Sequence, residues 1–208
     1  MQDLPLSLRE RNRIDTWTAV HETASSLALE EGLSSATIEA IAARSGISKR
    51  TFFNYFPTKE DAVLGTRAPT LPDELLERFR TSGDDLLTRT VRLLTGVLGT
   101  SFHGGAGYER RRAVVRAHPE LRARIMQHID ASEQLVDSVL NDRLGAADAA
   151  AAVEQLPDAV DSPRALLMLA GTITRFAYSR NPEATAVDVG GNIEESVNIF
   201  REVVKATL

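Results

Sequence analysis

Apolar residues recur at intervals of three and four along almost the whole chain, and no sustained alternating run rich in Val, Ile or aromatic residues interrupts them. This spacing is typical of amphipathic helices. The first strong apolar stripe predicts a helix at about 9–31, which Gly32 is placed to end. Two more strong stripes predict helices at about 164–180 and 190–206. The pattern therefore predicts an all-α fold.

Helix start and stop signals crowd the segment that follows the first stripe. Thr37, Ser48 and Thr58 can each accept hydrogen bonds from the free N–H groups at the start of a helix. Gly46 can take the positive φ of a tight turn, and Pro57 disfavours the helical conformation in the residue before it. These signals predict short helices at about 37–46, at 49–56 and from 59 onward.

The remainder of the chain predicts a larger helical body. Further helices are expected at about 73–80, 84–102, 109–117 and 119–144. The glycine-rich run at 104–107 predicts a break between two of them. The Ala-rich stretch at 145–163 predicts a short helix and a loop.

Composition excludes several classes of protein. The 208 residues are 43% hydrophobic, which is enough to bury a core, and they contain no Cys, so disulfides, thiol nucleophiles and cysteine-ligated metals are excluded. No apolar run is long enough to span a membrane and no signal peptide is expected, so a cytoplasmic protein is predicted. The net charge of −5 alone argues against nucleic-acid binding. Residues 40–59 nevertheless carry four basic side chains and no acidic one, which allows a local basic surface.

Residues 37–56 have the properties of a helix-turn-helix, in which Ile38 and Ile41 face inward and Ile47 fills the corner after the turn. The second helix of such a pair enters the DNA major groove with its N-terminal residues at the base edges. Lys, Arg, Asn and Thr side chains can read bases, while hydroxyl and ammonium groups suit phosphates. The pattern alone leaves a capped helical hairpin with solvated charges as the alternative. The predicted DNA contacts are Thr37, Ser48, Lys49, Arg50, Thr51, Asn54, Tyr55 and Lys59.

Four motifs follow one another in this part of the chain, namely Thr37-Ile38-x-x-Ile41-Ala42, Gly46-Ile47-Ser48, Thr51-Phe52-Phe53 and Tyr55-Phe56-Pro57-Thr58-Lys59-Glu60-Asp61. Together, over about residues 9–64, they resemble the N-terminal domain of the TetR family of one-component transcriptional regulators. The resemblance implies a DNA-binding regulator and not an enzyme, with an all-helical C-terminal domain that binds an effector and dimerises. The family usually has Tyr where this chain has Phe53, so Phe53 is a candidate contact that lacks the phosphate-binding hydroxyl.

We therefore predict three parts: a flexible arm at 1–8, a helix-turn-helix DNA-binding domain at 9–58, and a helical effector-binding and dimerisation domain at 59–208. The helices at about 164–180 and 190–206 are expected to pair with their copies in a homodimer, which suits a palindromic operator. The expected function is a repressor that a small, largely apolar effector releases from DNA. The alternatives are an activator, an architectural DNA-binding protein, and a helical enzyme fused to a DNA-binding domain.

The effector site is predicted from apolar residues of the larger domain, which either wall a cavity between helices or form ordinary core. The expected lining residues are Leu94, Leu98, Phe102, His128 and Phe176. The four histidines lack the spacing of helical metal-ligand pairs, so neither a metal nor a cofactor is expected.

The segment 110–124 has two interpretations. It holds six Arg and one Glu, so it either meets the phosphates or carboxylate of a ligand or forms a solvated face paired with acidic residues at 148–161. Residues 111–124 also resemble a pattern in regulators that respond to acyl-coenzyme A thioesters. That resemblance makes a fatty acyl thioester a candidate effector.

Overall fold

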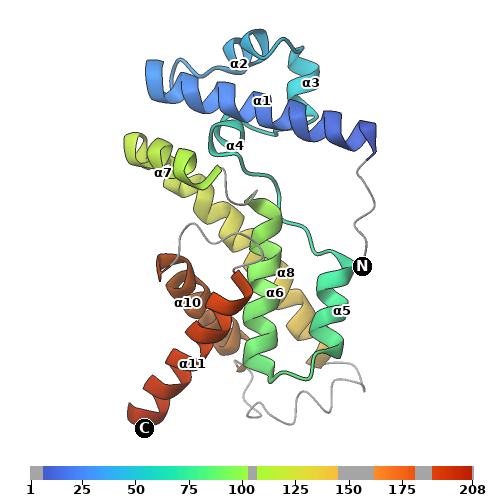
Figure 1. Cartoon of the computed structure of the whole chain (residues 1–208), viewed down its shortest axis with the longest axis vertical. Helices are drawn as coiled ribbons and strands as arrows, with labels where there is room; N and C mark the ends of the chain where they lie inside the picture. The colour runs from blue at the N-terminus through green and yellow to red at the C-terminus, as the bar shows by residue number, and fades with distance from the viewer. Residues whose placement is uncertain (1–6, 103–106, 145–161, 181–188, 208) are drawn as a thin grey trace. The chain divides into compact units, whose positions relative to one another are not determined.

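Regular secondary structure is helical throughout the residues that the computed structural model describes, which are 7–102, 107–144, 162–180 and 189–207 (Figure 1). The predicted all-α class is confirmed. The elements are α1 (Leu8–Glu31), α2 (Ile38–Arg44), α3 (Lys49–Phe53), α4 (Lys59–Leu64), α5 (Asp73–Thr81), α6 (Leu86–Ser101), α7 (Tyr108–Ala117), the 3-10 helix η2 (Pro119–Leu121), α8 (Arg122–Leu144), α10 (Ser162–Arg180) and α11 (Val189–Thr207). None of the described helices is long and apolar enough to cross a membrane.

The predicted capping residues of the three short helices are confirmed. The Thr37 Oγ1 accepts from the N–H of Ala40, 3.2 Å away, and the Ser48 Oγ accepts from Thr51 at 3.0 Å. Gly46 has the expected positive φ of 67° between α2 and α3. The predicted end of the second helix, at residue 56, is wrong because α3 ends at Phe53. Its last turn tightens into i→i+3 bonds, as Tyr55 N–H donates to the carbonyl of Phe52.

The chain divides into two compact units, which we call unit 1 (residues 1–67 and 109–125) and unit 2 (residues 68–108 and 126–208). This division differs from the predicted boundary between residues 58 and 59. Ala62 and Leu64 of α4 are fully buried in the same core as α1, and so are Val114 and Leu121. The sequence signal at Thr58 marks the start of a helix, whereas the extent of a compact unit follows from which residues share a core.

A buried histidine joins α1 to α4 inside unit 1, as expected for a core residue. The His21 Nδ1–H donates to the carbonyl oxygen of Ala62 at 2.8 Å, and Nε2 is buried with no hydrogen-bond partner. Burial is the main cause that lowers the pKa of His21, so the ring is neutral near pH 7. Gly65 ends α4 with a φ of 63°, and a Cβ there would lie 2.7 Å from the His21 ring. The close fit of glycine and ring fixes how α4 approaches α1.

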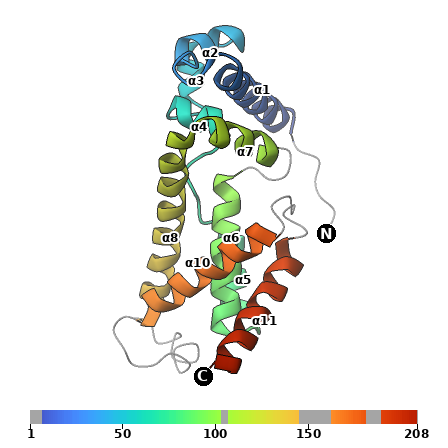
Figure 2. The same cartoon turned by 90° about the vertical axis from the view of Figure 1, so that its left-hand side faces the viewer.

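Unit 2 is built around α6, which packs against α5, α10 and α11 (Figure 2). Its core combines Leu94 and Val97 of α6 with Ile173 of α10 and Val197 of α11, all at most 1% exposed. These residues follow the three-and-four spacing that predicted their helices. The described parts of unit 2 thus form a helical bundle, as predicted.

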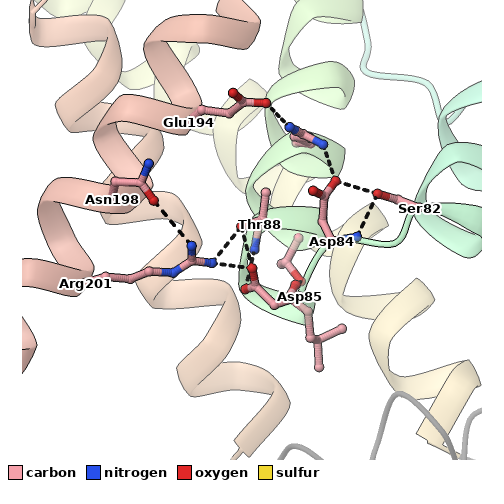
Figure 3. Close-up of polar contacts among 10 residues, drawn as sticks. Ser82, Asp84, Asp85, Thr88, Glu194, Asn198 and Arg201 are labelled. Carbon is pink, nitrogen blue, oxygen red and sulfur yellow. Dashed lines mark hydrogen bonds and ion pairs between the residues drawn. The ribbon is translucent and has the colours of Figure 1, made fainter.

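Two arginines add ion pairs to the packing of α11 on the start of α6 (Figure 3). Arg92 donates to Asp84 and to Glu194 of α11. Arg201 of α11 donates to Asp85 and, at 2.9 Å, to the hydroxyl of Thr88. Single exposed ion pairs contribute little stability, but two arginines that each bridge to a second element fix the direction of α11.

Candidate nucleic-acid interface

Helix α3 has one anchored face and one exposed polar face. Phe52 is fully buried, with its ring 6.0 Å from that of Phe56, which in turn packs 5.3 Å from Trp17 of α1. The residues on the other face are exposed or half-buried, namely Ser48, Lys49, Arg50, Thr51 and Asn54. An anchored helix with a polar face is the form in which recognition helices enter the major groove.

Lys49 already has a partner within the protein. Its ammonium group donates to the carboxylate of Glu39 on α2, and the two side chains are 58% and 62% exposed. The hydrogen bond from Lys49 is the main cause that lowers the pKa of Glu39. A DNA phosphate or a guanine would therefore compete with Glu39 for this ammonium group.

The hydroxyl groups predicted to contact phosphates serve as helix caps. Ser48 Oγ also lies 2.8 Å from the Oγ1 of Thr51, so the two hydroxyls hydrogen-bond to each other. Thr37 is exposed at the start of α2. A hydroxyl has one donor and two acceptor positions, so capping leaves each group able to bind a further partner.

Two of the predicted DNA contacts, Lys59 and Phe53, have surroundings that the sequence did not predict. The Lys59 ammonium donates to the carbonyl oxygen of Leu33 at 2.9 Å, so it fixes the turn after α1. Phe53 is 54% exposed and packs edge-on against Phe52. Phe53 thus offers an apolar surface, whereas the neighbouring hydroxyl of Tyr55 belongs to a half-buried residue.

An open hollow of about 850 Å³ lies between the first turns of α1 and the C-terminal end of α3. Its lining includes three of the predicted DNA contacts, Thr51, Asn54 and Tyr55, together with Arg9 and Arg13. Burial and the positive charge of Arg13 both lower the pKa of Arg67, which indicates a positive local potential. The sequence reasoning missed the α1 residues, although three arginines within residues 9–13 were the available signal.

The residues of this surface lie in a segment that matches a known protein family. Residues 21–64 match the model of the family described as bacterial regulatory proteins, tetR family. The chain therefore carries a DNA-binding segment of the tetR-family type at residues 21–64. The matched segment contains every predicted DNA contact, from Thr37 to Lys59. The family match supports the predicted class of DNA-binding transcriptional regulator.

Two solved structures are similar to this chain over most of its length. The first is the fatty acid degradation regulator FadR from Bacillus halodurans, with 16% identity, 94% of each chain covered and a TM-score of 0.41. The second is a protein assigned to the tetR-family transcription regulators from Shewanella sp. PV-4. It has 17% identity, covers 89% of this chain and 95% of its own, and has a TM-score of 0.38. No curated protein matches the chain.

The five predicted effector-lining residues all lie in unit 2. Leu94 and Leu98 are buried in its core, and Phe102 packs against the same cluster. The Phe102 ring also meets the buried His128 edge-on, with ring centroids 6.2 Å apart. Phe176 pairs instead with Phe200, at 5.4 Å. The structure thus brings Phe102 and His128 together, and the role of all five as effector contacts stays a prediction.

Proposed function

We propose that this protein is a transcriptional repressor that binds a palindromic operator as a homodimer and leaves it when a small, largely apolar effector binds. The observation that carries the proposal is the exposed polar face of α3, which shares a hollow with two arginines of α1. Such a repressor acts on chromosomal DNA in the cytoplasm.

The proposed contacts divide into two kinds. Arg50 and Lys49 read guanine edges, and Thr51 and Asn54 read thymine and adenine. The remaining predicted contacts, Thr37, Ser48, Tyr55 and Lys59, hold phosphates, with Phe53 packed beside them. To these we add Arg9 and Arg13, because the hollow that they line also contains Thr51 and Asn54. Phosphate contacts position the protein on the duplex, while the base contacts select the operator.

The homodimer is proposed to form through α10 and α11. Met168 of α10 is 66% exposed and Leu169 is 36% exposed. Val203 and Val204 of α11 are 56% and 46% exposed. A second copy of the chain would cover these apolar side chains in a four-helix interface. A two-fold dimer with its recognition helices about 34 Å apart would match half-sites in successive major grooves.

The effector is proposed to bind in unit 2, among the predicted lining residues of α6 and α8. Leucine and phenylalanine side chains favour an apolar ligand. A fatty acyl-coenzyme A thioester stays a candidate because of its acyl chain. Release then requires that the effector bind one arrangement of the dimer more tightly than the other, since only differential affinity shifts a population.

The proposal is tested first by fluorescence anisotropy with DNA from the protein's own upstream region, in a salt series with excess competitor DNA. Nanomolar binding of a palindromic segment that survives competition is the expected result. Weak, steeply salt-dependent binding of all sequences would instead indicate an architectural DNA-binding protein.

A transcription assay on the bound promoter then separates the two regulatory roles. A repressor lowers transcript yield, and an acyl thioester that is the effector restores it. An increase in transcript on adding the protein alone would refute repression and favour an activator.

A further inference from the structure

The arginine-rich segment 110–124 lies against protein groups of unit 1. Arg110 Nη1 is 3.3 Å from the hydroxyl of Ser25 and 3.2 Å from that of Ser26, both on α1. Arg111 Nε donates to the carbonyl oxygen of Leu64 at 2.8 Å. Arg111 therefore binds the C-terminal end of α4, where free carbonyl groups attract a cation. For Arg110 and Arg111 these contacts fit neither the ligand-binding nor the solvated interpretation, whereas Arg112, Arg116 and Arg122 are exposed. The acidic residues at 148–161, which the solvated interpretation pairs with the segment, lie outside the described residues.

Arg124, in the first turn of α8, forms a two-pronged ion pair with Asp61 of α4. Its Nε lies 2.8 Å from Oδ1, and its Nη2 lies 2.6 Å from Oδ2. Asp61 is 0% exposed, and its carboxylate also accepts hydrogen bonds from the hydroxyls of Thr58 and Thr66. Loss of Arg124 would leave a buried carboxylate without this arginine, which is costly in a protein interior.

Helix α4 is thus held at both ends by arginines from residues 109–125. It has six residues, too few to form a stable helix without tertiary contacts. It also carries Ala62, which accepts the hydrogen bond from His21, and Lys59, which fixes Leu33 after α1. A shift of α4 would therefore move the end of α1 and the buried rings on which α3 rests.

The helix that carries Arg124 continues from one compact unit into the other. Helix α8 runs from Arg122 to Leu144, and the boundary between the units falls between residues 125 and 126, inside it (Figure 2). The two earlier crossings fall between residues 67 and 68, in a non-helical stretch, and between residues 108 and 109, at the start of α7. Arg124 belongs to the first turn of α8, so a displacement of that turn acts on Asp61 through the ion pair.

We propose that Arg124 is a positioning residue for DNA binding. Through Asp61 it holds α4, and with it α1 and α3, in the arrangement that fits DNA. The inference rests on the proposed reading of operator DNA by α3. It is independent of which effector the protein binds.

The test compares Arg124→Met with Arg122→Met, a matched control that removes the same charge from an exposed residue of the same turn. Operator and non-specific DNA binding are measured by anisotropy at 15 °C, where circular dichroism confirms that the variants are folded. We expect Arg124→Met to weaken operator binding about tenfold, within the range typical of coupling between sites. Arg122→Met and all non-specific binding should change by less than about threefold, because only a distant charge is lost.

A merely structural role predicts a different result. In that case Arg124→Met lowers the melting temperature but binds operator as tightly as Arg122→Met does, and the inference is overturned. Should Arg124→Met fail to fold, Arg124→Lys provides the measurement. A lysine keeps the charge but donates to one oxygen at a time, so operator affinity should fall part of the way. Wild-type affinity in Arg124→Lys would then overturn the inference.

Hydrogen exchange separates failure of this inference from failure of the proposed function. Arg124→Met should speed amide exchange in residues 49–55 and 59–65, and Arg122→Met should not. Unchanged exchange in residues 49–55 overturns the inference whatever the DNA result. Faster exchange there, combined with wild-type protein that fails to select an operator, would leave the coupling in place and refute operator reading by α3.

Discussion

The ion pair between Lys49 and Glu39 leads to a prediction that runs against the usual effect of mutating a DNA-binding domain. Replacing Glu39 by Gln should tighten DNA binding. The carboxylate holds the Lys49 ammonium that would otherwise meet a phosphate or a guanine, and it places a negative charge beside the recognition helix. The amide removes both effects and keeps the size of the side chain.

The magnitude follows from the exposure of the pair. Both side chains are more than half exposed, so water and salt screen the attraction and the pair holds Lys49 only weakly. An ion pair of this kind lowers the affinity of Lys49 for a competing anion about 1.4- to 5-fold. We therefore expect Glu39→Gln to bind DNA about 1.4- to 5-fold more tightly, with an unchanged melting temperature. The fall of log affinity with log salt concentration should steepen by up to about 0.9. In the wild type, Lys49 must leave the Glu39 carboxylate to bind DNA, and that carboxylate then takes up a cation from solution. Glu39→Gln has no such carboxylate.

A double-mutant cycle shows whether Glu39 acts through Lys49. Binding of the wild type, Glu39→Gln, Lys49→Met and the double variant is measured by anisotropy at three salt concentrations. In the Lys49→Met background, the gain from Glu39→Gln should shrink to the long-range effect of one charge, less than about twofold at 0.15 M salt. Equal or weaker binding by Glu39→Gln would refute the competition. An equal gain in both backgrounds would assign the effect to simple repulsion of phosphate.

Three further results are expected. Arg13→Ala should weaken binding of all DNA sequences and flatten the salt dependence of log affinity by about 0.9. Arg50→Ala should relax discrimination at particular base pairs. Loss of selectivity in Arg13→Ala would show that Arg13 contacts bases and not phosphates. Gly65→Ala should destabilise unit 1 by about 2–5 kcal/mol in urea unfolding, because the new Cβ meets the His21 ring at a positive φ; a loss under 1 kcal/mol would mean that the ring moves aside. The lowered pKa of His21 implies a contribution to stability that is complete above about pH 6.5 and is lost as pH falls through the folded-state pKa. His21→Gln should therefore lose less stability at acid pH than the wild type does in thermal melts. An identical pH profile of the melting temperature would exclude His21 as the cause of the acid loss of stability.

The helices could be predicted closely because their signals are local. A hydroxyl that accepts from the third N–H after it needs no distant partner, so Thr37, Ser48 and Thr58 marked helix starts that the structure has in place. The end of α3 is different. Its last turn tightens before Pro57, and a proline predicts that a helix stops without saying how many residues earlier.

The hollow between α1 and α3 could not be predicted in the same way. It exists because Phe52 packs against Phe56 and Phe56 packs against Trp17, which brings the first turns of α1 beside α3. The spacing of apolar residues predicts which face of each helix is buried, but it does not predict which two exposed faces meet. Arg13 was therefore visible as a basic residue and not as a neighbour of the recognition helix.

The arginines show the same limit on predicting function, because the sequence identifies basic residues and not their partners. The strongly basic segment 110–124 suggested a site for an anion, yet Arg111 and Arg124 are used inside unit 1 to hold the two ends of one short helix. Arg50 and Arg13, from other parts of the chain, stay exposed on the surface that faces DNA in the proposed complex. Net charge and charge runs count all these residues alike. Whether an arginine can bind a phosphate depends on whether a buried carboxylate or carbonyl has already taken it, and for Arg124 that carboxylate is Asp61.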